Sequence, residues 1–391
     1  MHNLRGRTVD HSIPFHDFDV LNFVLLGSKS GRYGGPFETS TAQVKLVTKQ
    51  SGLLFAGYFK GDAPNSQVPA FFVKVRHLIG LKSFFDVGSL KILIWCWKMS
   101  KNKVAHISFA RGITPFFVAF ICLARKSRTI LQTHGMLTSR TSLLIKVIDF
   151  FITKPIVRRS HCIIALTDIE RSSLSTWCPD IENKIKIIAN PAQISEPAQY
   201  IQPKQGTALF AARLHPRKRA LDFGLAAAFA SDRGFSETYL LLGPDEGDLE
   251  SVISATMGLP NFKYLGATDS SGALDEIRKC AVFVLASENE PWGNALVSAL
   301  VLGRPVVITQ SSHLADVVAK FKAGIVVPDK SPEDISRAIH DICEPSNYIL
   351  YSGNALKLSR EMFIPSSVKQ KLERLYDMEL SVLDRKEEVE E

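Results

Sequence analysis

A short stretch in the second half of the chain combines a carboxylate, a glycine turn and the start of a helix. Glu290, Gly293 and Asn294 follow an apolar run at residues 281–286 that has the length of a buried strand, and a helix-like stretch covers residues 294–302. This order brings free backbone N–H groups and the positive end of a helix dipole to one point. Such points bind anions, so we expect an anion site here.

Four cations follow another predicted strand, at residues 207–212, and precede a helix-like stretch at 220–231: Arg213, Arg217, Lys218 and Arg219. In a parallel sheet the carboxyl ends of the strands meet at one edge, which places these side chains near the anion site. Fixed cations stabilise the charge of a departing diphosphate. All four side chains are candidates for this role. A solvated basic turn is the alternative.

The order Glu290-Pro-Trp-Gly-Asn294, a helix, and then Gly303-Arg-Pro-Val-Val307 resembles the nucleotide-sugar loop of retaining glycosyltransferases of family 4, the glycosyl transferases group 1. These proteins have the α/β GT-B architecture, with two Rossmann-like, doubly wound parallel-sheet domains that face each other across a cleft. The resemblance implies that Glu290 lies near the hydroxyls of the donor sugar. It also implies that the backbone amides of three residues contact the sugar and diphosphate: Trp292, Gly293 and Asn294.

The same resemblance assigns the donor phosphates to Arg213 and Lys218, whose spacing is similar to that of the family's phosphate ligands, and leaves Arg217 and Arg219 as secondary candidates. One position departs from the family. Ser298 stands where a second glutamate, eight residues after the first, binds the ribose hydroxyls. Serine is shorter and uncharged, so a charge-assisted hydrogen bond of about 1.5–3 kcal/mol is lost or replaced by a weaker one. We keep Ser298 among the donor-binding residues, and the affinity for the donor depends on it.

Two segments of the first half resemble residues that border the family's cleft. His134 follows a predicted strand at residues 129–133 and opens the tetrad His-Gly-Met-Leu, which resembles the segment that contacts the transferring sugar. Without that resemblance, a lone histidine is more often structural than functional. Gly34 and Gly35 follow a predicted strand at residues 19–26 and resemble the loop between donor and acceptor. A plain flexible turn is the alternative for these glycines.

Length and composition suit two globular domains, because a chain of 391 residues is too long for one small core and 46% of its residues are hydrophobic. The net charge of +8 is unevenly divided: residues 1–200 hold 26 Lys and Arg against 12 Asp and Glu, a balance of +14, and the remainder holds 21 against 27, a balance of −6. A basic half attracts nucleic acid, an anionic membrane or an acidic acceptor. Because no nucleic-acid-binding motif accompanies it, we expect no nucleic-acid partner.

The six cysteines form no Cys-x-x-Cys pair and no metal-ligand spacing with histidine, and most lie in apolar contexts. Free thiols there behave as small core residues, so a reducing cytoplasm fits best. No Asp-x-Asp is placed to hold a metal beside the diphosphate, and we expect neither a metal nor a cofactor. The first 20 residues lack the apolar core of a secretory signal, and the most apolar segment, residues 113–123, is too short to span a membrane.

Strand-like and helix-like runs alternate along the chain, which indicates βαβ units and parallel sheets. We expect a first domain at residues 1–190, a linker at 191–205, a second domain at 206–365, and at 366–391 a helix that folds back toward the first domain and ends in an acidic tail. Expected helices include residues 37–50, 73–81, 90–98, 115–125, 332–342 and 366–383, and expected strands include 52–59, 105–109, 162–167, 186–191, 238–243, 262–266, 305–309 and 324–328.

A helical pattern between residues 140 and 160 carries an apolar stripe beside four cations: Lys146, Lys154, Arg158 and Arg159. Two interpretations remain open. In the first, the stripe lies on the acidic lipid surface of a membrane, which makes the protein peripheral at the inner face of the cell membrane. In the second, the stripe faces the core and only the basic face meets water.

The resemblance to family 4 implies a retaining hexosyltransferase that moves a sugar from a UDP- or GDP-sugar to a hydroxyl of a glycan or lipid-linked acceptor, in the synthesis of cell-envelope polysaccharide. The predicted catalytic residues are His134, Arg213, Lys218 and Glu290. A non-hydrolysing nucleotide-sugar epimerase shares the architecture but needs acidic and histidine residues in the cleft that we cannot assemble from this sequence. Ser298 favours another alternative, a catalytically weak or inactive relative that binds a sugar nucleotide or a partner protein.

Overall fold

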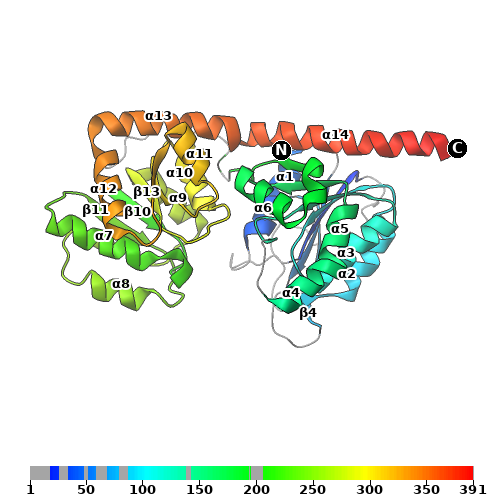
Figure 1. Cartoon of the computed structure of the whole chain (residues 1–391), viewed down its shortest axis with the longest axis horizontal. Helices are drawn as coiled ribbons and strands as arrows, with labels where there is room; N and C mark the ends of the chain where they lie inside the picture. The colour runs from blue at the N-terminus through cyan, green and yellow to red at the C-terminus, as the bar shows by residue number, and fades with distance from the viewer. Residues whose placement is uncertain are drawn as a thin grey trace, which may run out of the picture. The chain divides into compact units, whose positions relative to one another are not determined.

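The computed structural model describes residues 18–25, 34–47, 52–58, 68–78, 87–137, 142–192, 194 and 206–390. The chain divides into two compact units: Met1–Pro191 with Val368–Glu391, and Ala192–Ser367. Each unit contains a parallel β-sheet with helices packed against it (Figure 1). Both faces of such a sheet are covered, so its strands are expected to be apolar throughout rather than alternating.

In the described part of the first unit the main sheet has the parallel order β3-β2-β1-β6-β7-β8-β9. Every side chain of β1 and of β6 is buried, as a strand covered on both faces requires. The chain reverses its direction of winding between the neighbours β1 and β6. The strands are β1 Val20–Val24, β2 Gly52–Tyr58, β3 Ala70–Lys74, β6 Val104–Ser108, β7 Arg128–Gln132, β8 Cys162–Ala165 and β9 Ile185–Ile187, and β4 Arg76–His77 pairs with β5 Val87–Gly88 in a separate antiparallel ribbon.

Helices cover this first sheet, and α3 packs between α2 and α5 (Figure 1). Cys122 of α3 joins the buried core with Phe23 and Ile107 of the sheet. Its Sγ lies 3.6 Å from the Sγ of Cys96 in α2. The helical segments are α1 Gly34–Leu46, α2 Leu90–Met99, α3 Ile113–Ala124, α4 Leu143–Ile148, the π-helical segment η3 Asp149–Thr153, α5 Lys154–Arg159, α6 Asp168–Trp177 and the 3-10 segment η4 Pro179–Lys184.

The second unit has a parallel sheet with the order β12-β11-β10-β13-β14-β15 in its described residues. The strands are β10 Thr207–Ala211, β11 Thr238–Leu242, β12 Phe262–Tyr264, β13 Val282–Leu285, β14 Val306–Thr309 and β15 Gly324–Val327. The helical segments are η5 Pro216–Lys218, α7 Ala220–Asp232, α8 Leu249–Ala255, α9 Ser270–Lys279, α10 Asn294–Val301, α11 Ala315–Phe321, α12 Pro332–Cys343 and α13 Pro345–Met362. The winding reverses between β10 and β13, so the loops that follow these two strands flank the crevice where such sheets bind ligands.

The last helix, α14 (Pro365–Glu390), belongs to the first unit from Val368 onward. The Tyr376 hydroxyl and Nδ1 of His106 in β6 form a buried hydrogen bond of 2.7 Å. At the start of β7, Nε of Arg128 donates a charge-assisted hydrogen bond of 2.5 Å to Oε2 of Glu379. A segment from the far end of the chain therefore supplies polar partners for the central strands of the first sheet.

The predicted fold class of two doubly wound parallel-sheet domains is confirmed. One predicted helix is wrong: within residues 73–81 the structure has the end of β3 and all of β4. Val73 and Val75 are buried while Lys74 and Arg76 are exposed, which is the alternation of a strand. The strand predicted at 186–191 corresponds to β9, which starts earlier and is shorter than predicted.

Two helices, α8 and α13, have no counterpart among the expected elements. The buried residues of α13 are small or polar apart from Leu358, so its sequence carries only a faint amphipathic stripe. The predicted leader before residue 18, the loop at 27–33 and most of the linker at 191–205 lie outside the described residues. Among the helices that the structure describes, none has both the length and the apolar content needed to cross a membrane.

We expect mild acid to destabilise the first unit through His106. Burial lowers the pKa of His106 from 6.5 to about 4, although a hydrogen bond with Gln132 opposes the shift. Between these values the unfolded chain binds a proton that the folded chain does not, so the free energy of unfolding falls as the pH falls, by about 1.4 kcal/mol per pH unit. Denaturant unfolding at a series of pH values should give a shallower pH dependence for His106→Gln than for the wild type.

The exposed His215 provides a matched control for this experiment. His215→Gln should keep the pH dependence of the wild type. The assignment to His106 fails if the two variants have the same pH dependence.

Candidate functional site

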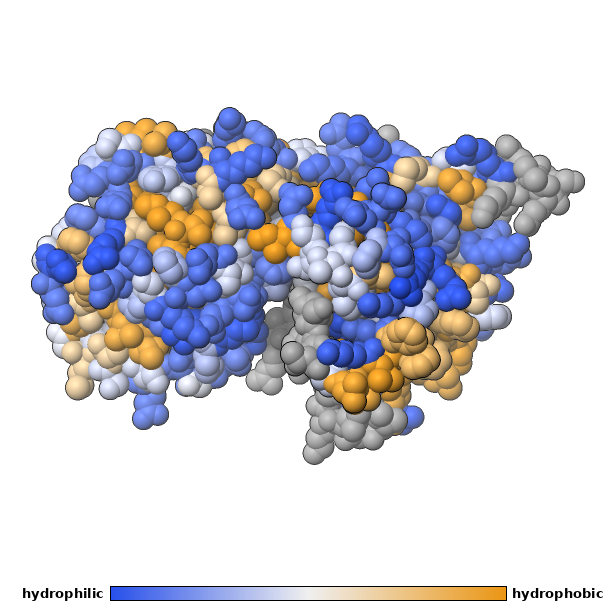
Figure 2. Space-filling view, viewed as in Figure 1, coloured by the Kyte–Doolittle hydropathy of each residue, from blue (hydrophilic) through white to orange (hydrophobic). Residues whose placement is uncertain are grey.

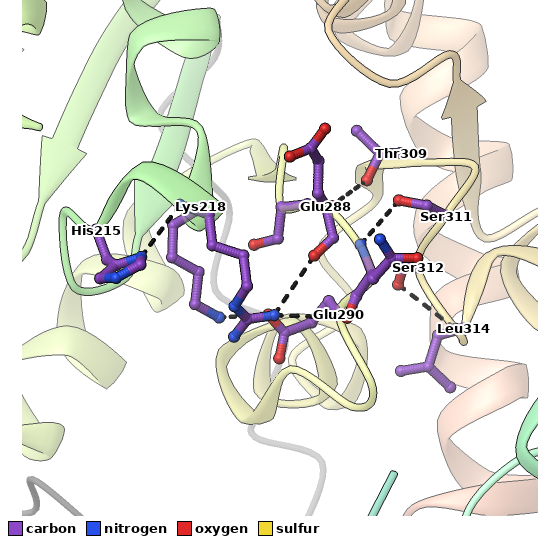
Figure 3. Close-up of polar contacts among 11 residues, drawn as sticks. His215, Lys218, Glu288, Glu290, Thr309, Ser311, Ser312 and Leu314 are labelled. Atoms are coloured by element: carbon purple, nitrogen blue, oxygen red, sulfur yellow. Dashed lines mark hydrogen bonds and ion pairs between the residues drawn. The ribbon is translucent and has the colours of Figure 1, made fainter. Parts of the chain in front are cut away.

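Two loops at the winding reversal of the second sheet are joined by an ion pair. Lys218 lies in the loop after β10, Glu290 lies in the loop after β13, and the Nζ of Lys218 contacts Oε2 of Glu290 (Figure 3). Both side chains are largely buried, with 14% and 9% of their surface exposed. Two predicted site residues that are distant in the sequence therefore meet where the topology favours ligand binding.

The electrostatics of this pair show an excess of positive charge. Burial lowers the pKa of Lys218, and Arg217 and Arg213 lower it further, while Glu290 opposes the shift and does not cancel it. Arg217 and Lys218 both face Glu290, and Arg213, which lies near Lys218, pairs with Glu246, so three cations and two carboxylates leave one positive charge in excess. An anion bound here would stabilise the charged form of Lys218, which is the electrostatic requirement of a phosphate site.

The segment at residues 213–219, which we call the basic loop, carries three further cations, and their side chains point in different directions. Nη1 of Arg217 lies 3.6 Å from Oε2 of Glu290, so this secondary candidate takes part in the cluster. Arg213 is half exposed, and its Nη1 lies 2.9 Å from Oε2 of Glu246. Arg219 forms two hydrogen bonds with Asp222, of 2.7 and 2.8 Å, and caps α7 instead of joining the cluster. The structure thus brings Arg217 and Lys218 to Glu290, with Arg213 engaged at its edge.

Backbone hydrogen bonds fix the loop that carries Glu290. The amide of Glu288 donates to the carbonyl of Arg217 at 3.0 Å, and the amide of His313 donates to the carbonyl of Glu290 at 2.9 Å. The amide of Asn289 donates to Oγ of Ser311 at 2.9 Å, and this hydroxyl donates to Asp329 at 2.8 Å. The loop is thereby tied both to the basic loop and to the segment after β14, two of the segments drawn in Figure 3.

The other residues that were predicted to bind the nucleotide sugar lie in the turn that leads into α10 and in α10 itself. Gly293 has a φ of +76°, in the left-handed region, and caps the helix that begins at Asn294. The side chain of Trp292 is buried, with its ring 5.6 Å from that of Phe363 in an edge-to-face contact. In this turn the backbone, and not the side chains, is therefore available to a ligand. It includes amides of the first turn of α10, and amides at that position have no hydrogen-bond partner within the helix. Ser298 is buried one turn further along α10.

In the first unit, His134 lies in a turn directly after β7. His134 has a φ of +49° and Gly135 a φ of +72°, so two successive residues are left-handed, a conformation that is strained for histidine. Nε2 of His134 lies 3.2 Å from Oγ of Ser108, which lies 3.3 Å from Oγ of Ser40 in α1. Burial of the ring, with a smaller effect of His106, lowers the pKa of His134 to about 3. The imidazole is therefore neutral at pH 7, able to donate one hydrogen bond and accept one.

A buried carboxylate that the sequence analysis did not select holds this turn. Glu170 of α6 accepts hydrogen bonds from the hydroxyl of Thr133, from the amide of Gly135 at 2.5 Å and from the amide of Leu166 at 2.7 Å. The side chain of Thr167 accepts from the amide of Glu170, as in a capping box, and Thr-x-x-Glu was the available signal. Glu170 is thus a positioning residue for the strained turn of His134.

The predicted site residues fall into one group in each unit. Arg213, Lys218, Glu290, Trp292, Gly293, Asn294 and Ser298 belong to the second unit, and His134, Gly34 and Gly35 belong to the first. Gly34 and Gly35 form the first turn of α1, the helix that Ser40 connects to Ser108 and so to His134. Among the described residues, no group of three or more His, Cys, Asp or Glu side chains is arranged to hold a metal ion.

The second unit contains the stretch that matches a known family. Residues 205–344 match the family described as glycosyl transferases group 1. The chain is also similar to the D-inositol 3-phosphate glycosyltransferase of Jonesia denitrificans, with 22% identity over 201 residues. That similarity covers 46% of this chain and 47% of the other, so it spans about half the length of this curated relative.

Solved structures resemble nearly the whole chain. HepE of Anabaena in complex with UDP has a TM-score of 0.71 at 13% identity, covering 92% of this chain and 100% of HepE. The complex of HepE with UDP-glucose has a TM-score of 0.68 at 15% identity, covering 92% and 99%. Sucrose-phosphate synthase of Thermosynechococcus elongatus has a TM-score of 0.70 at 15% identity, covering 93% and 99%. The chain has the GT-B fold. At such low identities these similarities establish the fold and nothing further.

We expect Glu170→Gln to loosen the turn of His134. A glutamine turns one acceptor oxygen into an NH₂ group that faces donors, so about 2–3 kcal/mol of charge-assisted hydrogen bonding is lost. Hydrogen exchange of the Gly135 amide should accelerate by at least about tenfold. The exposed Glu182 gives a matched control, and Glu182→Gln should leave the exchange unchanged. Equal protection of Gly135 in both variants would show that the carboxylate does not hold the turn.

Proposed function

We propose that this protein is a glycosyltransferase that moves a sugar from a nucleotide-diphosphate sugar to an acceptor hydroxyl, with retention of anomeric configuration as in family 4. The observation that carries the proposal is the Lys218–Glu290 pair, with its surplus of positive charge, at the winding reversal of a glycosyl transferases group 1 domain. An anion site alone would fit many ligands. Its place in a domain of this family narrows the choice to a sugar nucleotide.

The donor diphosphate is assigned to the basic loop and the start of α10. Lys218 and Arg213 contact the phosphates in this proposal, and the amides of Gly293 and Asn294 add donors at the helix N-terminus. Glu290, freed in part from Lys218 when the phosphates bind, accepts hydrogen bonds from the hydroxyls of the sugar. A UDP-sugar is the first candidate, since HepE has been solved with UDP and with UDP-glucose; a GDP-sugar is the second.

The reaction places an acceptor hydroxyl on the face of the sugar that the diphosphate leaves. The bond between the anomeric carbon and the phosphate oxygen breaks, the acceptor oxygen bonds to that carbon, and the proton passes to the departing phosphate. Lys218 and Arg213 stabilise the negative charge that develops on the diphosphate. His134, neutral at pH 7 and held in a fixed turn, hydrogen-bonds the transferring sugar. No carboxylate pair of the glycosidase type takes part.

The acceptor in this proposal is a glycan or a lipid-linked glycan of the cell envelope, made on the cytoplasmic side. The balance of +14 in residues 1–200 suits an acidic or membrane-borne acceptor. All six cysteines are free thiols, which supports a reducing compartment. The relative from Jonesia is named for a sugar phosphate acceptor, D-inositol 3-phosphate, so small phosphorylated acceptors belong in the same screen.

Calorimetric titration with UDP, GDP and ADP, with and without magnesium, tests the donor site. We expect micromolar binding of one nucleotide to the wild type and its loss in Lys218→Ala and Arg213→Ala. Turnover of the matching nucleotide sugar should fall by about 10²–10³-fold in each variant. One hydrogen-bond donor that stabilises the transition state contributes about 2.7–4 kcal/mol.

Lys320→Ala, which removes an exposed lysine elsewhere in the second unit, should behave as the wild type. Thermal unfolding of each variant separates loss of binding from loss of fold. Full activity of both Lys218→Ala and Arg213→Ala would overturn the assignment of the phosphates.

We expect Ser298→Glu to tighten donor binding, because the longer carboxylate can accept hydrogen bonds from the ribose hydroxyls, each worth about 1.5–3 kcal/mol. Ser298→Ala, which removes only the hydroxyl, is the matched control. An unchanged or weaker affinity of Ser298→Glu would mean that the site is built around serine. Absence of nucleotide binding in the wild type would favour a catalytically inactive relative, the alternative that Ser298 suggests.

A further inference from the structure

An exposed apolar surface covers one side of the first unit. We define the apolar face by its most prominent residues: Phe117, Phe120, Leu143, Leu144, Phe150 and Phe151. Of the eighteen exposed large hydrophobic side chains in the described residues, eleven lie in α2, α3 or residues 143–153. Figure 2 shows orange side chains gathered over the end of the first unit where Figure 1 places α4. Apolar side chains that gather in this way mark an interaction surface.

The structure decides between the two interpretations of the stripe at residues 140–160 for most of its length. α4 has no buried residue, whereas a core-facing helix would bury its stripe. The π-helical segment Asp149–Thr153 shifts the register, so Phe150, Phe151 and Ile152 are all exposed in succession. Ile148 packs partly against the core, and Ile156 and Val157 of α5 turn into it. Most of the stripe between residues 143 and 152 therefore faces outward.

A groove runs along the apolar face between α3 and the η3–α5 segment. Its volume is about 700 Å³, and its lining includes Phe117, Phe120, Phe151 and Pro155. Arg159 is the one cationic side chain among the lining residues of this groove. A hydrocarbon chain with an anionic head group matches this distribution of apolar walls and a single cation.

Cations predominate among the exposed charges of the segments that form the apolar face. In α2, α3 and residues 143–159 the single acidic residue is Asp149, which is buried and held by Arg111 through two hydrogen bonds of 2.8 Å. Exposed basic residues in the same segments are Lys91, Lys98, Lys146, Arg158 and Arg159. Among these, Arg158 pairs with Asp180 at 2.7 Å. The face therefore complements an anionic partner and repels a basic one.

A tryptophan of α2 is partly exposed and contacts an arginine that follows α3. Trp97 of α2 is half exposed, and the guanidinium carbon of Arg125 lies 4.8 Å from the centre of its ring. Tryptophan beside arginine or lysine is the arrangement found where proteins meet the head-group region of lipids. A basic rim, an apolar centre and an interfacial tryptophan together fit a bilayer better than they fit an acidic protein.

We propose that the apolar face docks on an anionic bilayer, with Phe117, Phe120 and Phe151 among the acyl chains and the lysines and arginines at the lipid phosphates. Apolar burial and charge attraction both contribute to such peripheral binding. This inference stands independently of the proposed transfer reaction. It requires no membrane-spanning helix.

Vesicle flotation with the full chain tests the proposal. The probes are vesicles of phosphatidylcholine alone and of phosphatidylcholine mixed with phosphatidylglycerol. We expect the wild type to float with the anionic vesicles and to be released by salt. Phe120→Ser combined with Phe151→Ser should weaken the partition by about tenfold or more for each side chain removed.

Two further variants make the result specific. Met257→Ser with Ile349→Ser removes side chains of the second unit that are as exposed, at 82% and 73%, as Phe120 and Phe151, at 63% and 70%, and should bind as the wild type does. Lys146→Gln with Arg159→Gln should lower the affinity for anionic vesicles by about fivefold for each charge.

Three results would overturn the proposal: no flotation of the wild type with anionic vesicles, an equal loss in the Met257 and Ile349 variant, or a wild-type dimer that Phe120→Ser with Phe151→Ser converts to a monomer. The last would mean that a second copy of the chain covers the face. Thermal unfolding of the same phenylalanine variant checks that the first unit is folded. Nucleotide titration of that variant keeps this test separate from the donor site, which lies in the other unit.

Discussion

The ion pair between Lys218 and Glu290 is the contact on which the candidate site of the second unit depends. Each side chain is nearly buried, and a buried charge without its partner is strongly unfavourable, so the two loops hold each other in place. The pair nevertheless does not balance the local charge, because Arg217 and Arg213 lie near the same lysine. The same few side chains thus hold the loops rigid and leave positive charge that no carboxylate neutralises. A rigid site with excess positive charge is preorganised to bind an anion.

The sheets explain why the sequence could predict that the loops of Lys218 and Glu290 lie together. Strands covered on both faces are continuous apolar runs, and these are visible in the sequence at 207–211, 282–285 and 306–309. Once the strands are parallel, their carboxyl ends must share an edge. The approach of Lys218 to Glu290, across more than seventy residues, follows from that rule and from the order of the strands.

What escaped the sequence depends on contacts that leave little local pattern. The segment after β3 alternates buried and exposed residues over too few positions to be told from a helix, and α13 buries mostly small and polar side chains. The direction of the stripe at 143–152 is a property of packing, since the same residues would suit a core. Glu170 lies in a Thr-x-x-Glu sequence that is typical of a helix cap, and its contacts with Thr133 and Gly135 arise only when β7 and α6 are brought together.

Glu170 also constrains how this sequence can diverge. Its carboxylate serves a hydroxyl and two backbone amides, and one of the amides belongs to a glycine whose left-handed conformation few other residues adopt. A lineage that loses the glutamate must therefore change the turn of His134 as well, and one that changes the turn gains freedom at position 170. Because Thr133, Gly135 and Glu170 share these hydrogen bonds, the substitutions that each position tolerates depend on the other two.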